Sequence, residues 1–296
     1  MPRVAKQTGG PGVRRVVPSS NGAMNGVASR ISTIQPTKLG RLKCSLYGGP
    51  KTGKTRLACT FPKPLLLIGA EDGTASVVGT EGVDFVMLES TDELTELVEG
   101  PVKEGRYKTV ALDNATKMRE LRIVELFAAM GMEVPERKPF LYADKVWKNV
   151  WVQCSQDMRR FLGLLLDLPR VMPLNVVVIA QEAALYQEDA GAGASSDLIK
   201  PKVSSALGDK LANWLNAECD YICQTLIRSQ TKEAKGVGGA TRTVPTGKSE
   251  YCLRVGPHEV YQTGFRLPLN APPLPDFVVD PTYDKLAALI SGKKIG

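Results

Sequence analysis

The sequence predicts an α/β protein with a mostly parallel central sheet, helices on both faces and an antiparallel C-terminal edge. A strand-like segment at 42–47 runs through a glycine-rich turn into a segment that can open a helix. Short apolar runs, typical of strands buried on both faces, then alternate with longer helical segments. This alternation indicates parallel strands joined by helices.

The apolar runs place the expected strands along the chain. After 42–47, strands are expected at 64–70, 83–88, 107–112, 175–180, 219–227, 249–255 and 258–265. The last three resemble antiparallel strands around a mobile loop at 229–248, and they form the expected C-terminal edge.

Helix signals separate most of these strands. After the helix that opens near Thr55, helices are expected at 93–98, 116–130, 143–166, 204–216 and 282–291. Ser90 and Glu93 predict a capping box for the first of these, and Asp280-Pro281 predicts the start of the last. The Gly-, Ala- and Ser-rich stretch 187–203 predicts a loop.

Positive charge is concentrated at the N-terminus. The chain of 296 residues carries a formal charge of +7, and residues 1–43 hold eight Lys and Arg and no acid, which leaves 7 − 8 = −1 for the remainder. Residues 1–38 lack helical or strand periodicity, so we expect a disordered basic tail. A polyanionic partner is indicated for the tail and for local patches only, and a solubilising tail is the alternative.

Cysteine usage and hydropathy favour a cytoplasmic protein. The six cysteines form no C-x-x-C pair and His258 is the only histidine, so reduced core thiols are expected in place of a zinc site. The N-terminus has no apolar signal segment. Charges and prolines interrupt the longest apolar region, 161–180, so we expect no membrane span.

The turn after the first strand fits the phosphate-binding loop pattern G-x-x-x-x-G-K-[ST] in full. Its glycines let the backbone N–H groups point at phosphate oxygens. Lys54 is expected to reach the β- and γ-phosphates, and Thr55 to hold Mg²⁺. An ordinary Gly-Pro turn is the alternative. The expected nucleotide-binding residues are Gly48, Gly49, Pro50, Lys51, Thr52, Gly53, Lys54 and Thr55.

Polar residues end the other predicted parallel strands, where ligands bind in open α/β sheets. Asp113 is a candidate second Mg²⁺ group, and Glu71 is a candidate to polarise the attacking water, with Asp72 as its rival. Gln181 is a candidate sensor of the γ-phosphate. The alternative for each is an ordinary solvated turn or strand-end side chain.

Three segments together carry a family resemblance. They are Tyr47 to Thr55, then Leu66-Leu67-Ile68-Gly69-Ala70-Glu71-Asp72-Gly73-Thr74, then Ala111-Leu112-Asp113. The pattern resembles the phage-type nucleotide-binding proteins of the RecA-like P-loop group of AAA family ATPases, related to the RecA and RadA recombinase core. The resemblance covers about 40–292, and it implies a RecA-like ATPase domain at 39–292 after the tail.

The resemblance implies a slow, DNA-stimulated ATPase of DNA recombination or repair, with phage or prophage origin. ATP and Mg²⁺ would be its cofactors, Glu71 its catalytic base, Asp113 its Walker B acid and Gln181 its sensor. Its partners would be single-stranded DNA, further copies in a ring or filament, and a single-strand-binding protein.

The resemblance also implies two DNA-binding loops. The first, at 131–146, carries Arg137, Lys138, Phe140, Tyr142 and Lys145, and the second, at 183–204, carries Lys200 and Lys202. Basic residues interleaved with aromatic ones suit a single strand. Lys200, Lys202 and Arg266 are the candidates for a basic residue that reaches a neighbour's γ-phosphate. Solvated connections are the alternative for both loops.

Two other functions fit the same loop. One is an ATP-dependent switch or assembly factor that acts on proteins without DNA, which the near-neutral body favours. The other is a small-molecule kinase that uses 229–248 as a basic lid.

Overall fold

The computed structural model describes residues 39–293 and 295, except 72, 74, 76, 136–144, 188–199 and 236–240. The predicted tail 1–38 and Asp72 therefore lie outside the described residues. So do Arg137, Lys138, Phe140 and Tyr142 of the first predicted DNA loop.

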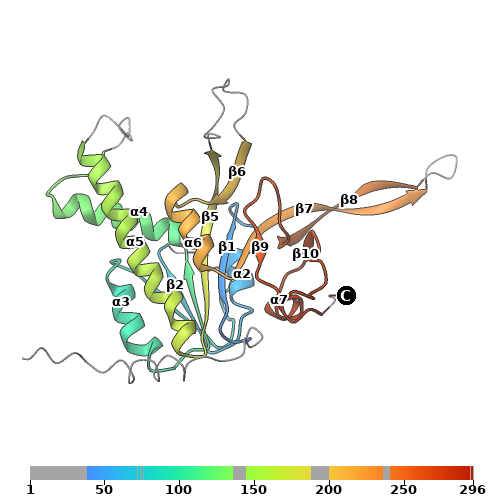
Figure 1. Ribbon diagram of the computed structural model, residues 1–296, viewed down its shortest axis with the longest axis horizontal. Helices are drawn as coiled ribbons and strands as arrows, with labels where there is room; N and C mark the ends of the chain where they lie inside the picture. The colour runs from blue at the N-terminus through green and yellow to red at the C-terminus, as the bar shows by residue number, and fades with distance from the viewer. Residues whose placement is uncertain are drawn as a thin grey trace, which may run out of the picture. The chain divides into compact units, whose positions relative to one another are not determined.

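The centre of the fold is a ten-stranded sheet (Figure 1). Its main order is β10-β8-β7-β1-β5-β4-β2-β3, while β6 pairs with β5 and β9 pairs with β7. The six strands from β7 to β3 are parallel, and β8 and β10 add an antiparallel edge, so the predicted fold class is confirmed. The strands are β1 Lys43–Gly48, β2 Leu65–Gly69, β3 Val83–Met87, β4 Thr109–Asp113, β5 Asn175–Gln187, β6 Lys200–Ser205, β7 Tyr221–Lys235, β8 Thr241–Arg254, β9 Gly264–Phe265 and β10 Phe277–Val279.

Helices cover both faces of this sheet. Successive residues of a strand point to opposite faces, and in β2 Leu66 and Ile68 belong to one core while Leu65 and Leu67 belong to the other. The first core includes side chains of α3 to α6, and the second includes side chains of α2 and α7. The helices are α2 Lys54–Ala58, α3 Glu93–Leu97, the π-helical turn Val98–Val102, α4 Ala115–Ala129, α5 Lys145–Val171, α6 Asp209–Glu218 and α7 Tyr283–Ile290.

The region after β5 departs from the prediction. The helix expected at 204–216 begins at Asp209, because Lys200–Ser205 forms β6 and pairs antiparallel with the end of β5. Within the predicted loop 187–203, Gln187 therefore belongs to β5 and residues 200–203 belong to β6, while residues 188–199 lie outside the described residues. Pairing satisfies backbone groups that the protruding end of β5 would otherwise leave open.

A second hairpin replaces most of the loop predicted at 229–248. β7 continues to Lys235 and β8 begins at Thr241, and the two strands pair antiparallel with an irregularity between Ser229 and Thr231. Beyond the sheet they form a two-stranded ribbon (Figure 1). The sequence of residues 228–235 and 241–249 is mostly polar, so it lacks the apolar alternation that reveals a half-buried strand.

Several predicted boundaries were also wrong. No side chain caps α3, so the predicted capping box is absent there, and the carboxylate of Glu93 accepts instead from the backbone of Glu89. Thr282 caps α7 in place of Asp280-Pro281. The strand expected at 258–265 is reduced to β9, and β10 was not expected.

A partly buried ion network joins α4 to α5. The guanidinium of Arg122 donates to Asp157 at 2.7 and 2.9 Å and to Glu125 at 2.9 Å. Glu125 also accepts from the backbone N–H and the hydroxyl of Thr91. The Arg122 side chain is only 17% exposed, so its charge is partly screened from water and depends on these two acids.

We expect Arg122→Ala to lower the free energy of unfolding by about 3 kcal/mol, because it leaves two poorly solvated carboxylates without their cation. Urea denaturation measures the change. The control is Arg106→Ala, which removes an exposed pair with Glu104 and should change stability by about 0.5 kcal/mol or less. Similar losses in both variants would contradict the role of the network.

Candidate functional site

The phosphate-binding loop begins where β1 ends, at a point of close backbone approach. Gly48 aligns with Gln181 of β5 on one side and with Thr225 of β7 on the other. A Cβ atom at Gly48 would lie 2.2 Å from the Thr225 hydroxyl oxygen and 2.4 Å from its carbonyl oxygen. Only glycine therefore fits at the start of the loop.

Hydrogen bonds hold the loop in one shape. The hydroxyl of Thr52 donates to the carbonyl of Gly49 at 2.8 Å and lies 2.6 Å from the hydroxyl of Thr225. Gly53 has φ +87°, in the left-handed region that favours glycine, directly before α2. The structure thus gives a steric reason for both glycines that the sequence motif requires, Gly48 and Gly53.

The ammonium of Lys54 turns back onto the loop. Its Nζ donates to the carbonyls of Gly48 at 2.8 Å and of Gly49 at 2.6 Å. Burial lowers the pKa of Lys54, and the carboxylates of Asp113, Glu182 and Glu71 oppose that shift. The ammonium therefore sits among loop carbonyls and acids, where an anionic ligand can compete for it.

Thr55 and Asp113 form a pair of oxygen donors. The Thr55 hydroxyl donates to Oδ2 of Asp113 at 2.5 Å, which joins the start of α2 to the end of β4. Burial raises the pKa of Asp113, while the Thr55 hydrogen bond and the Lys54 charge lower it. A hydroxyl and a carboxylate in contact are the hard ligands that suit Mg²⁺ bound to phosphates, so the residues present fit this metal.

Glu71 is held by a residue that the sequence analysis did not identify. The Nδ2 group of Asn114 donates to Oε1 of Glu71. The Oδ1 atom of Asn114 accepts from the backbone N–H of Lys117 at 2.8 Å and so caps α4. One amide therefore anchors the helix that follows β4 and orients the carboxylate that follows β2.

These groups share one cavity of about 650 Å³. It brings together the loop, Glu71, Asp113 and Gln181, all of which were predicted from the sequence, and it adds Asn114 and Tyr251. The lining residues are Pro50, Lys51, Thr52, Gly53, Lys54, Thr55, Arg56, Glu71, Gly73, Ala75, Asp113, Asn114, Gln181 and Tyr251.

Gln181 lies beside the loop, and hydrogen bonds hold both its backbone N–H and its carbonyl. Its N–H donates to the Thr116 hydroxyl at 3.1 Å, and its carbonyl accepts from Ala206 at 2.7 Å. The next residue, Glu182, accepts from Nε2 of Gln224 at 3.0 Å. Its other carboxylate oxygen is 3.4 Å from a Cβ position at Gly49, so it adds negative charge beside the loop.

Lys145, Lys202 and Arg266 are the residues predicted for DNA or for a neighbouring subunit whose side chains the structure describes, and none of the three lines this cavity. Lys145 is exposed at the start of α5, and Lys202 is half-buried on β6. Arg266 pairs with Asp220 at 2.8 Å and donates to the carbonyl of Ala217. The backbone of Lys200 belongs to β6, and its side chain lies outside the described part of the structure.

Asn114, Thr225 and Tyr251 were not predicted, and the sequence offers a signal for the first of them only. Asn114 directly follows the predicted strand-end Asp113, so the same strand-end argument covers it. Thr225 and Tyr251 come from β7 and β8, at least 170 residues after the loop. No local pattern points from them to the loop, because only the sheet order brings them together.

A glycine loop between a parallel strand and a helix, with Lys54, Thr55 and a strand-end Asp113 converging on one cavity, defines a P-loop nucleotide-binding site. The sequence pattern of the AAA domain family matches residues 41–267, and the chain belongs to this family. It is thus an AAA-type P-loop ATPase.

No curated protein matches the sequence. Within the described residues, no helix is both long and apolar enough to cross a membrane.

The two loop glycines give a matched pair of variants. We expect Gly48→Ala to lower the free energy of unfolding by about 2 kcal/mol, because its Cβ would overlap both atoms of Thr225 and force the strands apart. At Gly49 the nearest atom is the movable end of Glu182 at 3.4 Å, so Gly49→Ala should have a much smaller effect. Chemical denaturation compares them, and equal stability of the two variants would contradict the close approach at Gly48.

Proposed function

We propose that the chain binds ATP with Mg²⁺ in this cavity and hydrolyses it in a process of DNA recombination or repair that involves single-stranded DNA. The observation that carries the ATPase part is the meeting of two polar pairs beside the loop. Thr55 with Asp113 offers metal ligands, and Asn114 with Glu71 offers an oriented carboxylate.

Each residue then has a distinct role. Lys54 leaves the loop carbonyls and pairs with the β- and γ-phosphates. Thr55 and Asp113 hold Mg²⁺, which when bound neutralises charge on the phosphate oxygens. Glu71 orients the attacking water and accepts its proton, and Asn114 keeps that carboxylate in place. Gln181, next to Gly48 in the sheet, reports the γ-phosphate to the hairpin of β5 and β6.

The DNA part of the proposal rests on charge and on the family resemblance. Exposed Lys145 and Lys148 begin α5, Lys202 lies on β6, and the 1–43 segment carries eight basic residues without an acid. Phosphate groups attract such side chains without regard to sequence. We propose a domain at 39–292 that assembles as a ring or filament, with slow turnover until DNA and a neighbouring subunit are present.

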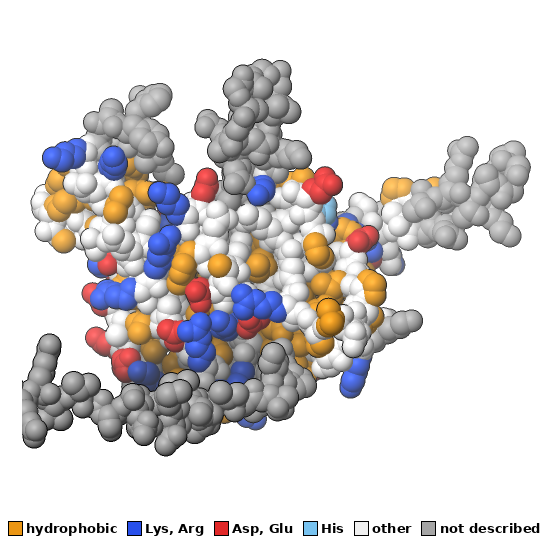
Figure 2. Space-filling view, in the orientation of Figure 1, with side chains coloured by type: hydrophobic (Ala, Val, Ile, Leu, Met, Phe, Trp, Pro, Cys, Tyr) orange, Lys and Arg blue, Asp and Glu red, His pale blue; other side chains and the backbone are white. Residues whose placement is uncertain are grey.

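A second function, an ATP-dependent switch acting on proteins, is favoured by one surface feature. Val124, Met130, Met132 and Val146, at the end of α4 and the start of α5, are 37–51% exposed. Figure 2 shows hydrophobic side chains on the surface over the end of α4 and the start of α5, and an exposed apolar surface suits a protein partner. This function predicts ATP hydrolysis that does not respond to DNA.

We expect Glu71→Gln to retain ATP binding while turnover falls about 100-fold or more, because a neutral amide cannot accept the proton of water. Phosphate release and binding of a fluorescent ATP analogue are measured in parallel. Lys54→Ala is the control, and it should lose binding itself. If Glu71→Gln turns over normally and Asp72→Asn does not, the base lies one residue further along the chain.

The DNA part is tested by phosphate release from ATP with and without single-stranded DNA, at two salt concentrations. Stimulation that fades as salt rises is expected, because bound cations are released when basic side chains contact phosphates. Hydrolysis that is indifferent to DNA at both salt concentrations would contradict this part and favour the protein-directed switch.

A further inference from the structure

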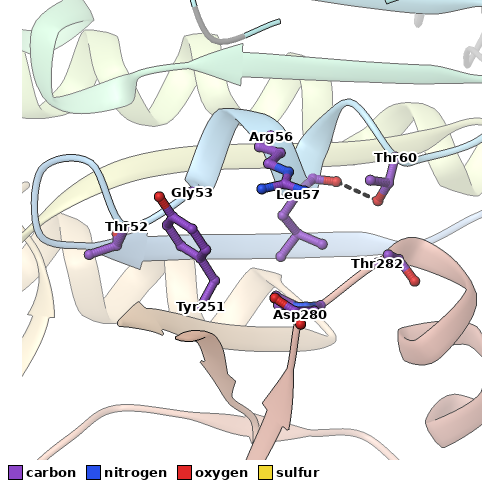
Figure 3. A pocket seen from close by; sticks show the side chains of 9 residues that line it. Thr52, Gly53, Arg56, Leu57, Thr60, Tyr251, Asp280 and Thr282 are labelled. Carbon is purple, nitrogen blue, oxygen red and sulfur yellow. Dashed lines mark hydrogen bonds between the residues drawn. The ribbon is translucent and has the colours of Figure 1, made fainter. Parts of the chain in front are cut away.

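A second, smaller cavity adjoins the one around the loop. Its volume is about 130 Å³. It shares Thr52, Gly53, Arg56 and Tyr251 with the larger cavity, so the two lie next to each other at the first turn of α2. Figure 3 shows it between α2, the Tyr251 ring and the segment at Asp280. A molecule bound at the loop could therefore extend into it.

Its walls combine one aromatic ring with apolar and charged groups. Tyr251 stands on one side, while Leu57, which is 2% exposed, and Asp280 stand on the other (Figure 3). The Arg56 guanidinium lies 5.9 Å from the centre of the Tyr251 ring. The ring is 39% exposed, so part of its surface is available for stacking.

Hydrogen bonds to backbone atoms fix the segments that carry Tyr251 and Asp280. The N–H of Asp280 donates to the carbonyl of Tyr251 at 2.8 Å. The ammonium of Lys285 donates to the carbonyls of Val279 at 2.7 Å and Asp280 at 3.1 Å. The ring of Tyr251 also packs on the loop, since its Cδ1 lies 3.2 Å from a Cβ position at Gly53. The wall is thus fixed relative to the loop before any ligand binds.

The polar groups of the cavity are not equally available. The Thr60 hydroxyl donates to the carbonyl of Leu57 and accepts from the N–H of Tyr283, and the Thr282 hydroxyl caps α7. The carboxylate of Asp280, in contrast, makes no hydrogen bond or ion pair to any residue that the structure describes. Asp280 is exposed and lines the cavity, so its carboxylate is open to a ligand beside the Tyr251 ring.

We propose that this cavity binds the adenine base of the nucleotide, with the base stacked on Tyr251 and its exocyclic amine donating to Asp280. The proposal rests on the function proposed above and adds the source of base selectivity. A carboxylate accepts hydrogen bonds and donates none. It therefore favours a base edge that carries an amine over hypoxanthine, which carries a carbonyl at the same position.

The test compares the affinities of ATP, ITP and inorganic tripolyphosphate, each with Mg²⁺, by calorimetry. The wild-type protein should bind ATP roughly 10- to 100-fold more tightly than tripolyphosphate, since stacking of one base contributes about 1–3 kcal/mol. Tyr251→Ala should lose most of this advantage, because its affinity for ATP should fall much more than its affinity for tripolyphosphate. Tyr251→Phe, which keeps the ring, should behave like the wild type.

Asp280→Ala provides an independent variant away from the ring. It should bring the affinity for ATP towards that for ITP and leave tripolyphosphate binding unchanged. Thermal melting of each variant checks that it is folded.

Two results would overturn the base site. One is unchanged ATP affinity in Tyr251→Ala, and the other is an equal loss for ATP and tripolyphosphate, which would make the ring a support of the loop alone. If the wild-type protein binds neither ligand, the proposed function fails, and the base site fails with it.

Discussion

The structure depends on the shared direction of four neighbouring strands. β1, β5, β4 and β2 are parallel, so their carboxyl ends meet at one edge of the sheet. The register places Gly48 beside Gln181 and Gly69 beside Asp113. Residues as distant in the chain as Pro50 and Gln181 thereby face a single cavity, and the remaining elements cover and brace this edge.

Local signals identified most of the candidate site residues at the ends of buried parallel strands, although Asn114 was missed. The loop at 48–55, Asp113 and Gln181 each follow a short apolar run, and both the run and the polar residue after it are visible in the sequence. Glu71 was predicted in the same way, because it comes shortly after the apolar run of β2. The structure brings all of them into contact with the same cavity, as the strand-end argument requires.

The parts that escaped prediction depend on pairing between distant segments. The ribbon of β7 and β8 resembles a loop in sequence because its residues are mostly polar and show no apolar alternation. Its part of β7 is a strand because it pairs with β8, a later segment of the chain. Thr225 and Tyr251 lie on this ribbon or at its base, so their proximity to the loop was equally hidden.

Fold and chemistry are joined most directly at Asn114. A cap is needed there because β4 passes straight into α4, whose first N–H groups lack partners within the helix. The same amide that supplies the cap also bonds Glu71. The position of the carboxylate is thus tied to the start of α4, and α4 is itself braced against α5 through Arg122.

The charges around Lys54 favour a nucleotide that binds together with a divalent cation. Asp113, Glu71 and Glu182 all raise the pKa of Lys54, so three carboxylates act on one ammonium whose own charge is disfavoured by burial. A bare triphosphate would add further negative charge to this group. The divalent cation that we propose on Thr55 and Asp113 would offset two of these charges and would also attract phosphate oxygens. The electrostatics of the cavity therefore favour a nucleotide that arrives as its magnesium complex.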